Sequence, residues 1–531
     1  MNILNLKEVL ILRKRLLLSL IMCASLLLTG CAHEQHQHKE VKVSLAREFN
    51  PNQLDAQGFD VPMPVYSAIY QPLVTYGKNG KIEPGLAKSW EVSDDGKDYT
   101  FHLKHHIQFN DGSTFNAKAV KFSIERAKAT DKTNPMETLD KLKSVNIKDN
   151  YTVEIHLKTP SNQVLNELSQ IRPLRMMSPH AVKGGKTTGQ FEKAIGTGPF
   201  KVADSTNETV TFKPNPYYHN HHPLDYDLTF QTIEDSDSRH LAIESHSIDI
   251  TGGSLGHLTP QQTKESYRNK DLKVKQYPST ETQFMAFNPE VGSLKNKAMH
   301  EAISKAIDTN HLSSNKQLKG LFQNGVEFVN DKNQHTHQYD PTQAIHLLEQ
   351  LGYKKNDRGY FEKNGRELSL KLALQTDEFP EWKTKAEIMQ QDLKKVGIHL
   401  DINVLDAQTY YETLTIRKDY DLIFYRSYTN ALMPYNFLNA RFKQDGNKPG
   451  MFANDTQLTD MLNGFSTIIN KEDKQRAFNQ ISHRIDHQYL EVPIAYPNEV
   501  FVTSPKIKHF EFSGQTDAPI NYDKLKVSNH E

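Results

Sequence analysis

The stretch DLIFYRSYTNALMPYNFL, residues 421–438, marks the end of a strand that we interpret as one wall of a ligand site. It opens with an apolar run of residues that favour β-structure, and this run stops at Arg426. The loop predicted here carries polar and aromatic side chains, namely Tyr425, Tyr428, Asn430 and Tyr435. Ligands of open α/β sheets usually bind outside the carboxyl ends of the strands. The alternative is an arginine that pairs with a surface carboxylate.

Length and charge limit the class of the protein. A chain of 531 residues is too long for one ordinary domain, so we expect two or more lobes. Its 64 basic and 64 acidic residues balance, and the chain has no long basic tract. We therefore expect no nucleic-acid partner.

The N-terminus has the pattern of a lipoprotein signal. Basic residues 13–15 precede an apolar run, residues 16–28, and Thr29, Gly30 and Cys31 follow. We expect residues 1–30 to be a signal peptide and Cys31 to be lipidated, which would anchor the protein at the extracellular face of the cell membrane. A plain signal peptide cleaved nearby, or a signal anchor, is the alternative, although the run is short for a membrane span.

A polar tether, residues 31–40, follows the anchor and contains His33, His36 and His38. Such a tract can collect cations, or it can be a solvated linker whose histidines do nothing specific. The only other cysteine, Cys23, lies in the leader, so the mature chain is expected to have no disulfide.

Helix and strand signals alternate along the rest of the chain. Asn116 is placed to cap one helix, and Asp340 is placed to begin another with a capping box. A further helix, residues 383–395, stops at Gly397 and leads into an alternating strand, residues 398–404. Strand, helix and strand followed by the 421–438 stretch predict an α/β lobe.

A pair of arginines forms a second candidate site. Pro173 and Leu174 separate Arg172 from Arg175, and the proline stiffens the loop between them. A rigid pair of guanidinium groups suits the recognition of carboxylates. Ordinary surface ion pairs are the alternative.

Catalytic and metal-binding signatures are incomplete. Residues 252–256 fit G-x-S-x-G with Ser254 at the serine position, but the sharp strand-to-helix turn that this motif needs is not predicted. Histidines cluster at 219–222 and 335–337 without an H-E-x-x-H helix, and we expect them to be solvated. We therefore expect that the protein is not an enzyme and has no catalytic cofactor. We also expect no identifiable metal ligand among its side chains.

Several motifs together resemble a known family, the family 5 extracellular solute-binding proteins of oligopeptide, dipeptide and nickel ABC importers. They include YQPLV at 70–74, LAKSWEVSDDGKDYTFHL at 86–103, FNDGSTFNA at 109–117, GTGPF at 196–200, NPYY at 215–218, YDPTQAIHLLEQLGY at 339–353 and DYDLIFYR at 419–426. The resemblance implies a two-lobed α/β fold like that of periplasmic binding proteins (type II, cluster C), which closes on its ligand.

The resemblance also implies domain boundaries. Lobe I would span residues 41–280, with an inserted subdomain at about 86–196, and lobe II would span 281–497. The last segment, residues 498–531, would return to lobe I.

Within this family, the chain resembles the nickel-binding members more than the peptide binders. Peptide binders place an acidic residue in the 421–438 stretch for the ligand's ammonium group, whereas residues 426–438 contain no Asp or Glu. The nickel binders resemble the chain at Arg-Pro-Leu-Arg and at Arg426, with an aromatic residue two positions later. This implies that Met63, Arg172, Arg426 and Tyr428 face the ligand cavity, and Arg175, Tyr425 and Asn430 are further candidates.

The resemblance implies a transported ligand rather than a cofactor. Residues 439–450 lack the histidine that some nickel binders add to the metal, and residues 130–136 lack their second arginine. We therefore expect a preformed Ni²⁺ chelate, with a small carboxylate chelator such as free histidine, held by a monomer that delivers it to an ABC permease and its ATPase. A di- or oligopeptide-binding protein is the alternative, and a serine hydrolase using Ser254 is the remote one.

Overall fold

The computed structural model describes residues 39–77, 81–130, 136–219, 224–313, 318–323, 326–335, 338–427 and 433–528. Cys31, Tyr428, Asn430 and most of the predicted tether lie outside these residues, so the roles expected of them stay predictions. Within the described part of the chain, no helix is long and apolar enough to cross a membrane.

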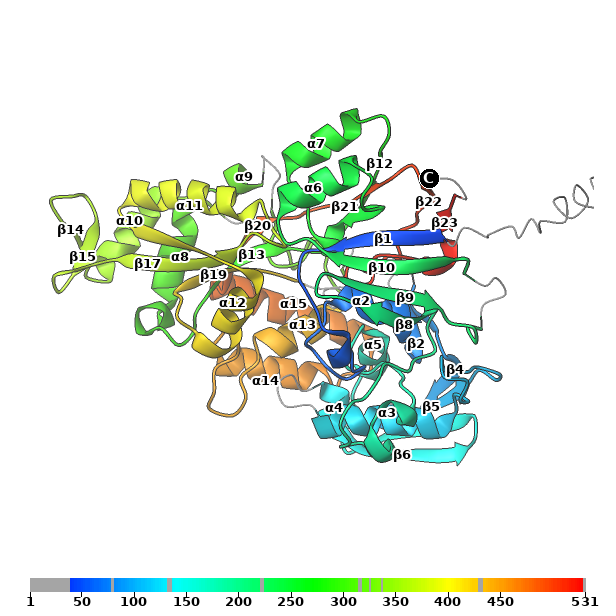
Figure 1. The fold of residues 1–531 in the computed structure, drawn as a ribbon. Coiled ribbons are helices and arrows are strands. Elements are labelled where there is room, and N and C mark those ends of the chain that lie inside the picture. The colour runs from blue at the N-terminus through cyan, green and yellow to red at the C-terminus, as the bar shows by residue number, and fades with distance from the viewer. Residues whose placement is uncertain are drawn as a thin grey trace, which may run out of the picture. The chain divides into compact units, whose positions relative to one another are not determined.

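The first large sheet has seven strands, in the order β12-β21-β11-β1-β10-β9-β8 (Figure 1). β1 (Lys39–Leu45) pairs in parallel with β11 (Ile250–Gly252), and its apolar residues Val41, Val43 and Leu45 are buried. The remaining strands are β8 (Phe200–Ser205), β9 (Thr209–Pro214), β10 (Tyr226–Thr232), β12 (Lys273–Tyr277) and β21 (Glu499–Thr503). β21 returns from the C-terminal part of the chain and pairs with β11 and β12.

A four-stranded antiparallel sheet is inserted between β1 and β8 in the sequence. Its order is β4-β5-β7-β6, with β4 (Ala87–Val92), β5 (Asp98–Leu103), β6 (Leu142–Asp149) and β7 (Thr152–Leu157). Helix α3 (Ala117–Thr130) begins where it was predicted, because the Asn116 side chain accepts hydrogen bonds from the backbone N–H groups of Lys118 and Ala119. Two short helices, α4 (Glu137–Lys141) and α5 (Val164–Ser169), complete this part.

The second large sheet has five strands, in the order β18-β17-β19-β13-β20. β17 (Ser369–Gln375), β18 (His399–Leu405) and β19 (Leu422–Arg426) run in parallel, so their carboxyl ends share one edge. β13 (Gln283–Phe287) is antiparallel to both β19 and β20 (Glu491–Ala495). This arrangement confirms the predicted strand at 421–426 with Arg426 at its end.

The helices of this second part also follow their sequence signals. α11 (Trp382–Val396) ends at Gly397, whose φ of 99° suits a glycine. α10 (Pro341–Gln350) begins at Asp340, whose side chain accepts a hydrogen bond from the backbone N–H of Gln343. The predicted N-cap is therefore formed, but the capping box is not, because the backbone N–H of Asp340 donates to the carbonyl of Lys305.

The predicted loop around Arg426 needs a correction. Tyr425 lies inside β19, where its side chain is 1% exposed, and Tyr435 lies in α13 (Pro434–Arg441). The two deviations have different causes. Successive strand residues point to opposite faces, so Tyr425 enters the core on the face opposite to Arg426, and Pro434 starts a helix at once.

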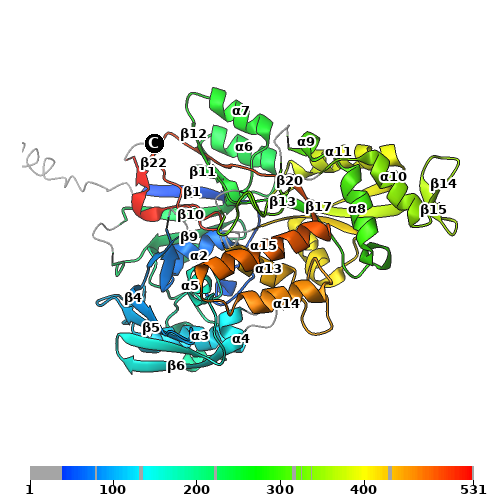
Figure 2. The same cartoon turned by 180° about the vertical axis from the view of Figure 1, so that it is seen from behind.

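The chain passes twice between the two large sheets, through residues 278–282 and residues 496–498 (Figure 2). The seven- and four-stranded sheets share one apolar core, and the five-stranded sheet has a second core. The exact domain boundaries given by the sequence remain predictions.

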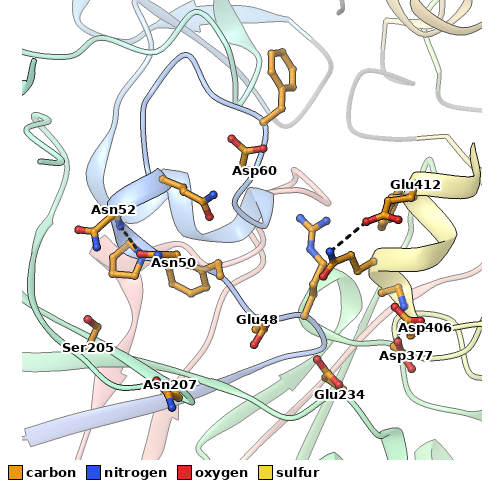
Figure 3. A pocket seen from close by; sticks show the side chains of 18 of the residues that line it. Glu48, Asn50, Asn52, Asp60, Ser205, Asn207, Glu234, Asp377, Asp406 and Glu412 are labelled. Atoms are coloured by element: carbon orange, nitrogen blue, oxygen red, sulfur yellow. Dashed lines mark hydrogen bonds between the residues drawn. The ribbon is translucent and has the colours of Figure 1, made fainter. Parts of the chain in front are cut away.

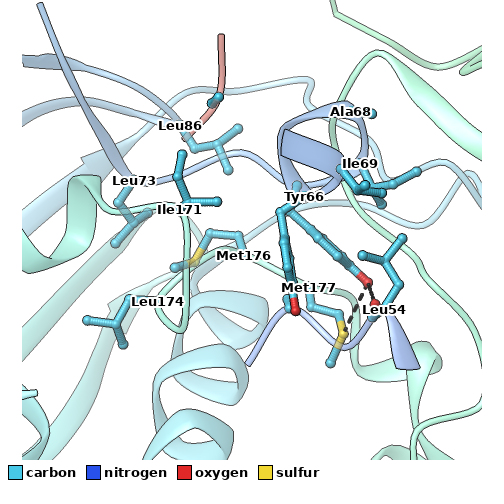
Figure 4. Close-up of a cluster of buried hydrophobic side chains, with 14 of the residues drawn as sticks. Leu54, Tyr66, Ala68, Ile69, Leu73, Leu86, Ile171, Leu174, Met176 and Met177 are labelled. Atoms are coloured by element: carbon cyan, nitrogen blue, oxygen red, sulfur yellow. Dashed lines mark hydrogen bonds between the residues drawn. The ribbon is translucent and has the colours of Figure 1, made fainter. Parts of the chain in front are cut away.

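The loop that carries Arg172 and Arg175 is fastened into the first core. Its apolar residues Ile171, Leu174, Met176 and Met177 are buried beside α2 (Met63–Ile69), as Figure 4 shows. The Tyr70 hydroxyl donates to the carbonyl of Leu54 at 2.7 Å in the same cluster. Packing therefore fixes the backbone from which the two arginines extend.

Candidate functional site

A cavity of about 1100 Å³ opens at the carboxyl ends of β17 and β18 (Figure 3). On the five-stranded side, it is lined by Asp377, which follows β17, and by Asp406 and Glu412 at the two ends of α12 (Ala407–Glu412). On the other side, the segment after β1 lines it with residues 47–53, Phe59 and Asp60, together with residues 205–207 and Glu234. Both large sheets thus contribute to one cavity, at the strand ends where ligands of α/β folds usually bind.

The cavity is strongly acidic. Carboxyl groups project from six of its lining residues, and they are Glu48, Asp60, Glu234, Asp377, Asp406 and Glu412. Burial raises the pKa of Asp377, and nearby Asp406 and Glu378 raise it further. The pKa of Glu234 is also raised, by burial and by Asp377. Arg47 is the one Lys or Arg among the lining residues that the structure describes, so the cavity favours a cationic ligand.

Arg172 is not a lining residue of this cavity, but it bonds to the backbone of Phe59, which is. Its Nη1 donates to the carbonyl oxygens of Phe59, at 2.7 Å, and Val61, at 3.0 Å. Its guanidinium lies over the rings of Phe59, at 4.9 Å, and Tyr66, at 5.6 Å. Among the described residues, Arg172 has no carboxylate within ion-pair distance, and its Nε is buried without a partner. Carbonyl oxygens and aromatic rings therefore hold this guanidinium next to the part of the wall that Phe59 forms.

Met63 begins α2, and Arg175 contacts the opposite end of this helix. Arg175 is 5% exposed, and its guanidinium donates to the carbonyl oxygens of Tyr70 (3.0 Å) and Gln170 (2.9 Å). Burial lowers the pKa of Arg175 to about 9. Its contacts hold the C-terminal end of α2, where helix carbonyls favour a cation. Met63 is the first residue of the helix and is half-buried.

Arg426 occupies a different environment. Its Nη1 donates to Glu281 Oε2 at 3.0 Å, its Nη2 lies 3.6 Å from Asp517 Oδ1, and its guanidinium lies over the Phe379 ring. Tyr425, on the other face of the strand, packs against Phe284 and Phe452. The structure does not bring Arg426 or Tyr425 into the lining of the acidic cavity, and their ligand roles stay predictions.

Polar contacts also join the part of the chain with the four-stranded sheet to the part with the five-stranded sheet. The hydroxyl of Tyr435 donates to Glu137 Oε2, and Asn436 Nδ2 donates to Glu167 Oε1 at 3.2 Å. Asn162 Nδ2 donates to the backbone carbonyl of Phe465 at 3.0 Å. We call these six residues the latch. It ties α13 and the end of α14 (Thr456–Phe465) to α4 and α5, and Figures 1 and 2 both show α14 beside α4.

The comparison with known proteins decides the family. Residues 81–449 match the model of bacterial extracellular solute-binding proteins, family 5. The chain belongs to this family. The prediction made from its motifs is thereby confirmed.

Relatives of this family 5 protein agree with that assignment. The nickel-binding periplasmic protein of Escherichia coli K12 is 26% identical over 521 residues, which cover 94% of this chain and 96% of the relative. The structure of NikA from Brucella suis with Fe(III)-EDTA has a TM-score of 0.80 and 25% identity, and it covers 92% of this chain and 100% of that one. The oligopeptide-binding protein AppA from Bacillus subtilis has a TM-score of 0.81 at 18% identity and covers 92% of this chain and 99% of that one.

These findings establish a solute-binding protein of an ABC importer rather than an enzyme, with the predicted α/β fold of periplasmic binding proteins. The surroundings of Ser254 agree with this. Its hydroxyl donates to the backbone carbonyl of Thr516 at 2.5 Å, so its proton is directed to a carbonyl rather than to a basic side chain.

The histidine clusters of this family 5 protein are only partly described. His219 Nε2 lies 3.0 Å from Gln71 Oε1, and His335 Nε2 lies 3.7 Å from Asp486 Oδ2, whereas His221, His222 and His337 lie outside the described residues. Among the residues that are described, no group of three or more His, Cys, Asp or Glu side chains is arranged to hold a metal ion.

Sequence reasoning missed the acidic wall and the partners of Arg426. Asp377 and Asp406 each come one or two residues after a strand, and a search for acidic residues at the ends of predicted parallel strands would have found them. Glu281 is 145 residues from Arg426 in the sequence, and no local signal links the two.

Proposed function

We propose that the protein binds a chelate of Ni²⁺, or of a related divalent metal, in the cleft between its two large sheets and delivers it to a membrane permease. The observation that carries this proposal is Arg172, a guanidinium without a carboxylate partner among the described residues, beside an acidic cavity. A metal chelate presents both charges, because its chelator offers carboxylates and its metal centre is cationic.

The family relationship supports nickel as the first metal to test, since the relative from Escherichia coli is a nickel-binding protein. Free histidine is a suitable chelator because imidazole and amine nitrogens suit nickel, and its carboxylate suits Arg172.

The leader supports a lipid anchor at Cys31. Recovery of the protein in the soluble rather than the membrane fraction of cells would count against that anchor.

A peptide is the second candidate ligand, and one observation favours it. Asp377 and Asp406 lie on the same wall of a cavity of about 1100 Å³, which is roomy enough for several residues, and either carboxylate could hold the ammonium group of a peptide. Binding of mixed tri- to pentapeptides without metal would favour this candidate over the chelate.

Replacement of Arg172 tests the chelate directly. Arg172→Ala should weaken binding of nickel with histidine by roughly 10- to 100-fold, because a hydrogen bond to a charged group is worth about 1.5–3 kcal/mol. Isothermal titration calorimetry measures the affinity. Arg476→Ala is the matched control, since this exposed arginine pairs with Asp473 on α15 (Lys471–His487), away from the cavity. Equal affinities for wild type and Arg172→Ala would refute the role of Arg172.

A further inference from the structure

Four charged side chains are buried together where the chain crosses between the two large sheets. Glu281 lies in the first crossing segment, Glu499 directly follows the second, Arg426 ends β19, and Asp517 belongs to the C-terminal segment. Their exposed fractions are 2%, 1%, 8% and 2%, respectively. We call this group the crossing cluster.

The cluster ties the two sheets together through the guanidinium of Arg426. Arg426 belongs to the five-stranded sheet, whereas Asp517 is followed by Ala518 and Ile520, which are part of the core of the seven-stranded sheet. Arg426 contacts Asp517 at 3.6 Å and Glu281 at 3.0 Å. A hinge movement at the two crossing segments would change the distances within this cluster and its access to water.

The cluster holds more negative than positive charge. Three carboxyl groups face one guanidinium, and burying carboxylates without compensation is costly, so some of them retain protons. Burial raises the pKa of Glu281 to about 7, although Arg426 lowers it. Burial also raises the pKa of Glu499 to about 8, and Glu281 raises it further.

The neighbouring groups that the structure describes add negative charge or are neutral, or direct their charge elsewhere. Gln283 Nε2 donates to Glu381 Oε1 at 2.9 Å, which adds another carboxyl group next to the cluster. His257 is the neighbouring histidine, and burial lowers its pKa to about 4, so it is neutral at physiological pH. Arg239, which also acts on His257, directs its guanidinium to backbone carbonyls that include those of Ile233 and Asp377.

We propose that the crossing cluster is a proton-linked lock: closing the cleft on a ligand takes up protons at Glu281 and Glu499, and opening it releases them. When the segments separate, water reaches the carboxyl groups and stabilises their charged form. The state described here, in which the cluster is buried and the latch bonds are made, therefore binds more protons than a state in which the segments have separated, and we take it as the closed state. By linkage, acid favours closure, and this advantage is lost as the pH rises past the pKa values of the closed state.

This inference rests on the proposed binding of a solute between the sheets. The first measurement is calorimetry of nickel with histidine binding to the full chain in two buffers with different ionisation enthalpies. We expect the binding enthalpy to depend on the buffer, as proton uptake requires, and the affinity to be roughly 10- to 100-fold higher at about pH 6.5 than at about pH 8.5. The same pH series for nickel binding to free histidine, without protein, corrects for protonation of the chelator.

Variants test whether the proton uptake occurs at the crossing cluster. Glu499→Gln and Glu281→Gln should each lower the number of protons taken up, because glutamine mimics the protonated carboxyl group without titrating. Asp486→Asn is the matched control, since burial raises the pKa of Asp486 to about 7 in a carboxyl group that lies on α15, outside the cluster. Equal uptake by wild type and both glutamine variants would overturn the proposal, as would an absence of uptake in the wild type.

A ligand-free measurement separates this proposal from the proposed function. Hydrogen–deuterium exchange of residues 278–282 and 496–498, corrected for the intrinsic effect of pH, should show more protection at about pH 6.5 than at about pH 8.5. If nickel with histidine does not bind at all, the proposed ligand fails while this exchange experiment still tests the lock. Exchange that is independent of pH in the wild type would overturn the lock even if the chelate binds.

Discussion

At the residue scale, two arginines expected in one site differ in how their charge is compensated. Arg426 faces Glu281 and Asp517, whereas Arg172 donates to the carbonyl oxygens of Phe59 and Val61 and has no carboxylate partner among the described residues. A guanidinium that is already paired offers little to an anionic ligand, because the ligand must displace its partner. Arg172 is therefore the better candidate for ligand recognition, and Arg426 for holding the two sheets together.

Removing Arg426 should expose this structural role. Arg426→Ala leaves buried carboxylates without their cation, and breaking such a pair costs about 3–5 kcal/mol of unfolding free energy near neutral pH. The pKa of Glu281 is already raised to about 7 by burial, and it should rise further in the variant because Arg426 lowers it. The loss of stability should consequently be larger at about pH 8 than at about pH 5.

Urea unfolding at the two pH values measures this loss, with the exposed Arg476→Ala variant as the control. A loss for Arg426→Ala that matches the control, or that does not change with pH, would contradict the assignment.

At the element scale, the latch residue Glu167 holds the amino end of the short helix α4. The backbone N–H groups of Glu137 and Thr138, at its amino end, donate to the Glu167 carboxylate at 2.9 and 2.7 Å. A carboxylate suits the amino end of a helix. The same carboxylate accepts a hydrogen bond from Asn436 of α13, so the cap of one helix is also a contact to the other part of the chain.

Loss of the Tyr435 hydroxyl should loosen the latch. Tyr435→Phe removes one hydrogen bond to Glu137, worth about 1 kcal/mol, and should weaken ligand affinity by roughly three- to tenfold through faster release. Stopped-flow dissociation measures the rate. Tyr70→Phe is the matched control, because this hydroxyl bonds Leu54 within one part of the chain. Equal release rates for the two variants would argue against a latch.

The elements themselves could largely be predicted from the sequence, because their signals are local. Asn116 caps α3, Gly397 ends α11, and the apolar run before Arg426 forms β19. The partners of the functional side chains could not be predicted in this way. Tyr435 and Glu137 are 298 residues apart, and their contact depends on how separate layers pack. The position of Tyr425 was also missed, because one residue along a strand changes the face on which a side chain lies.

At the scale of the whole molecule, two sheets are joined by two crossing segments, and the latch connects the same two parts elsewhere. The acidic cavity is lined from both sides, and Arg172 bonds to the backbone of its lining residue Phe59. In a two-lobed binding protein, closure over the ligand excludes water and strengthens each charged contact. The arrangement is consistent with a ligand that carries a cationic centre and a carboxylate together.

Native mass spectrometry of the protein with nickel, with and without free histidine, tests the central claim most directly. It reads the mass of the bound species and therefore identifies metal and chelator together. We expect a complex that contains nickel and histidine when both are supplied, and a much weaker signal with nickel alone. An unchanged protein mass in the presence of both, or a stable complex with metal-free peptides in their place, would contradict it.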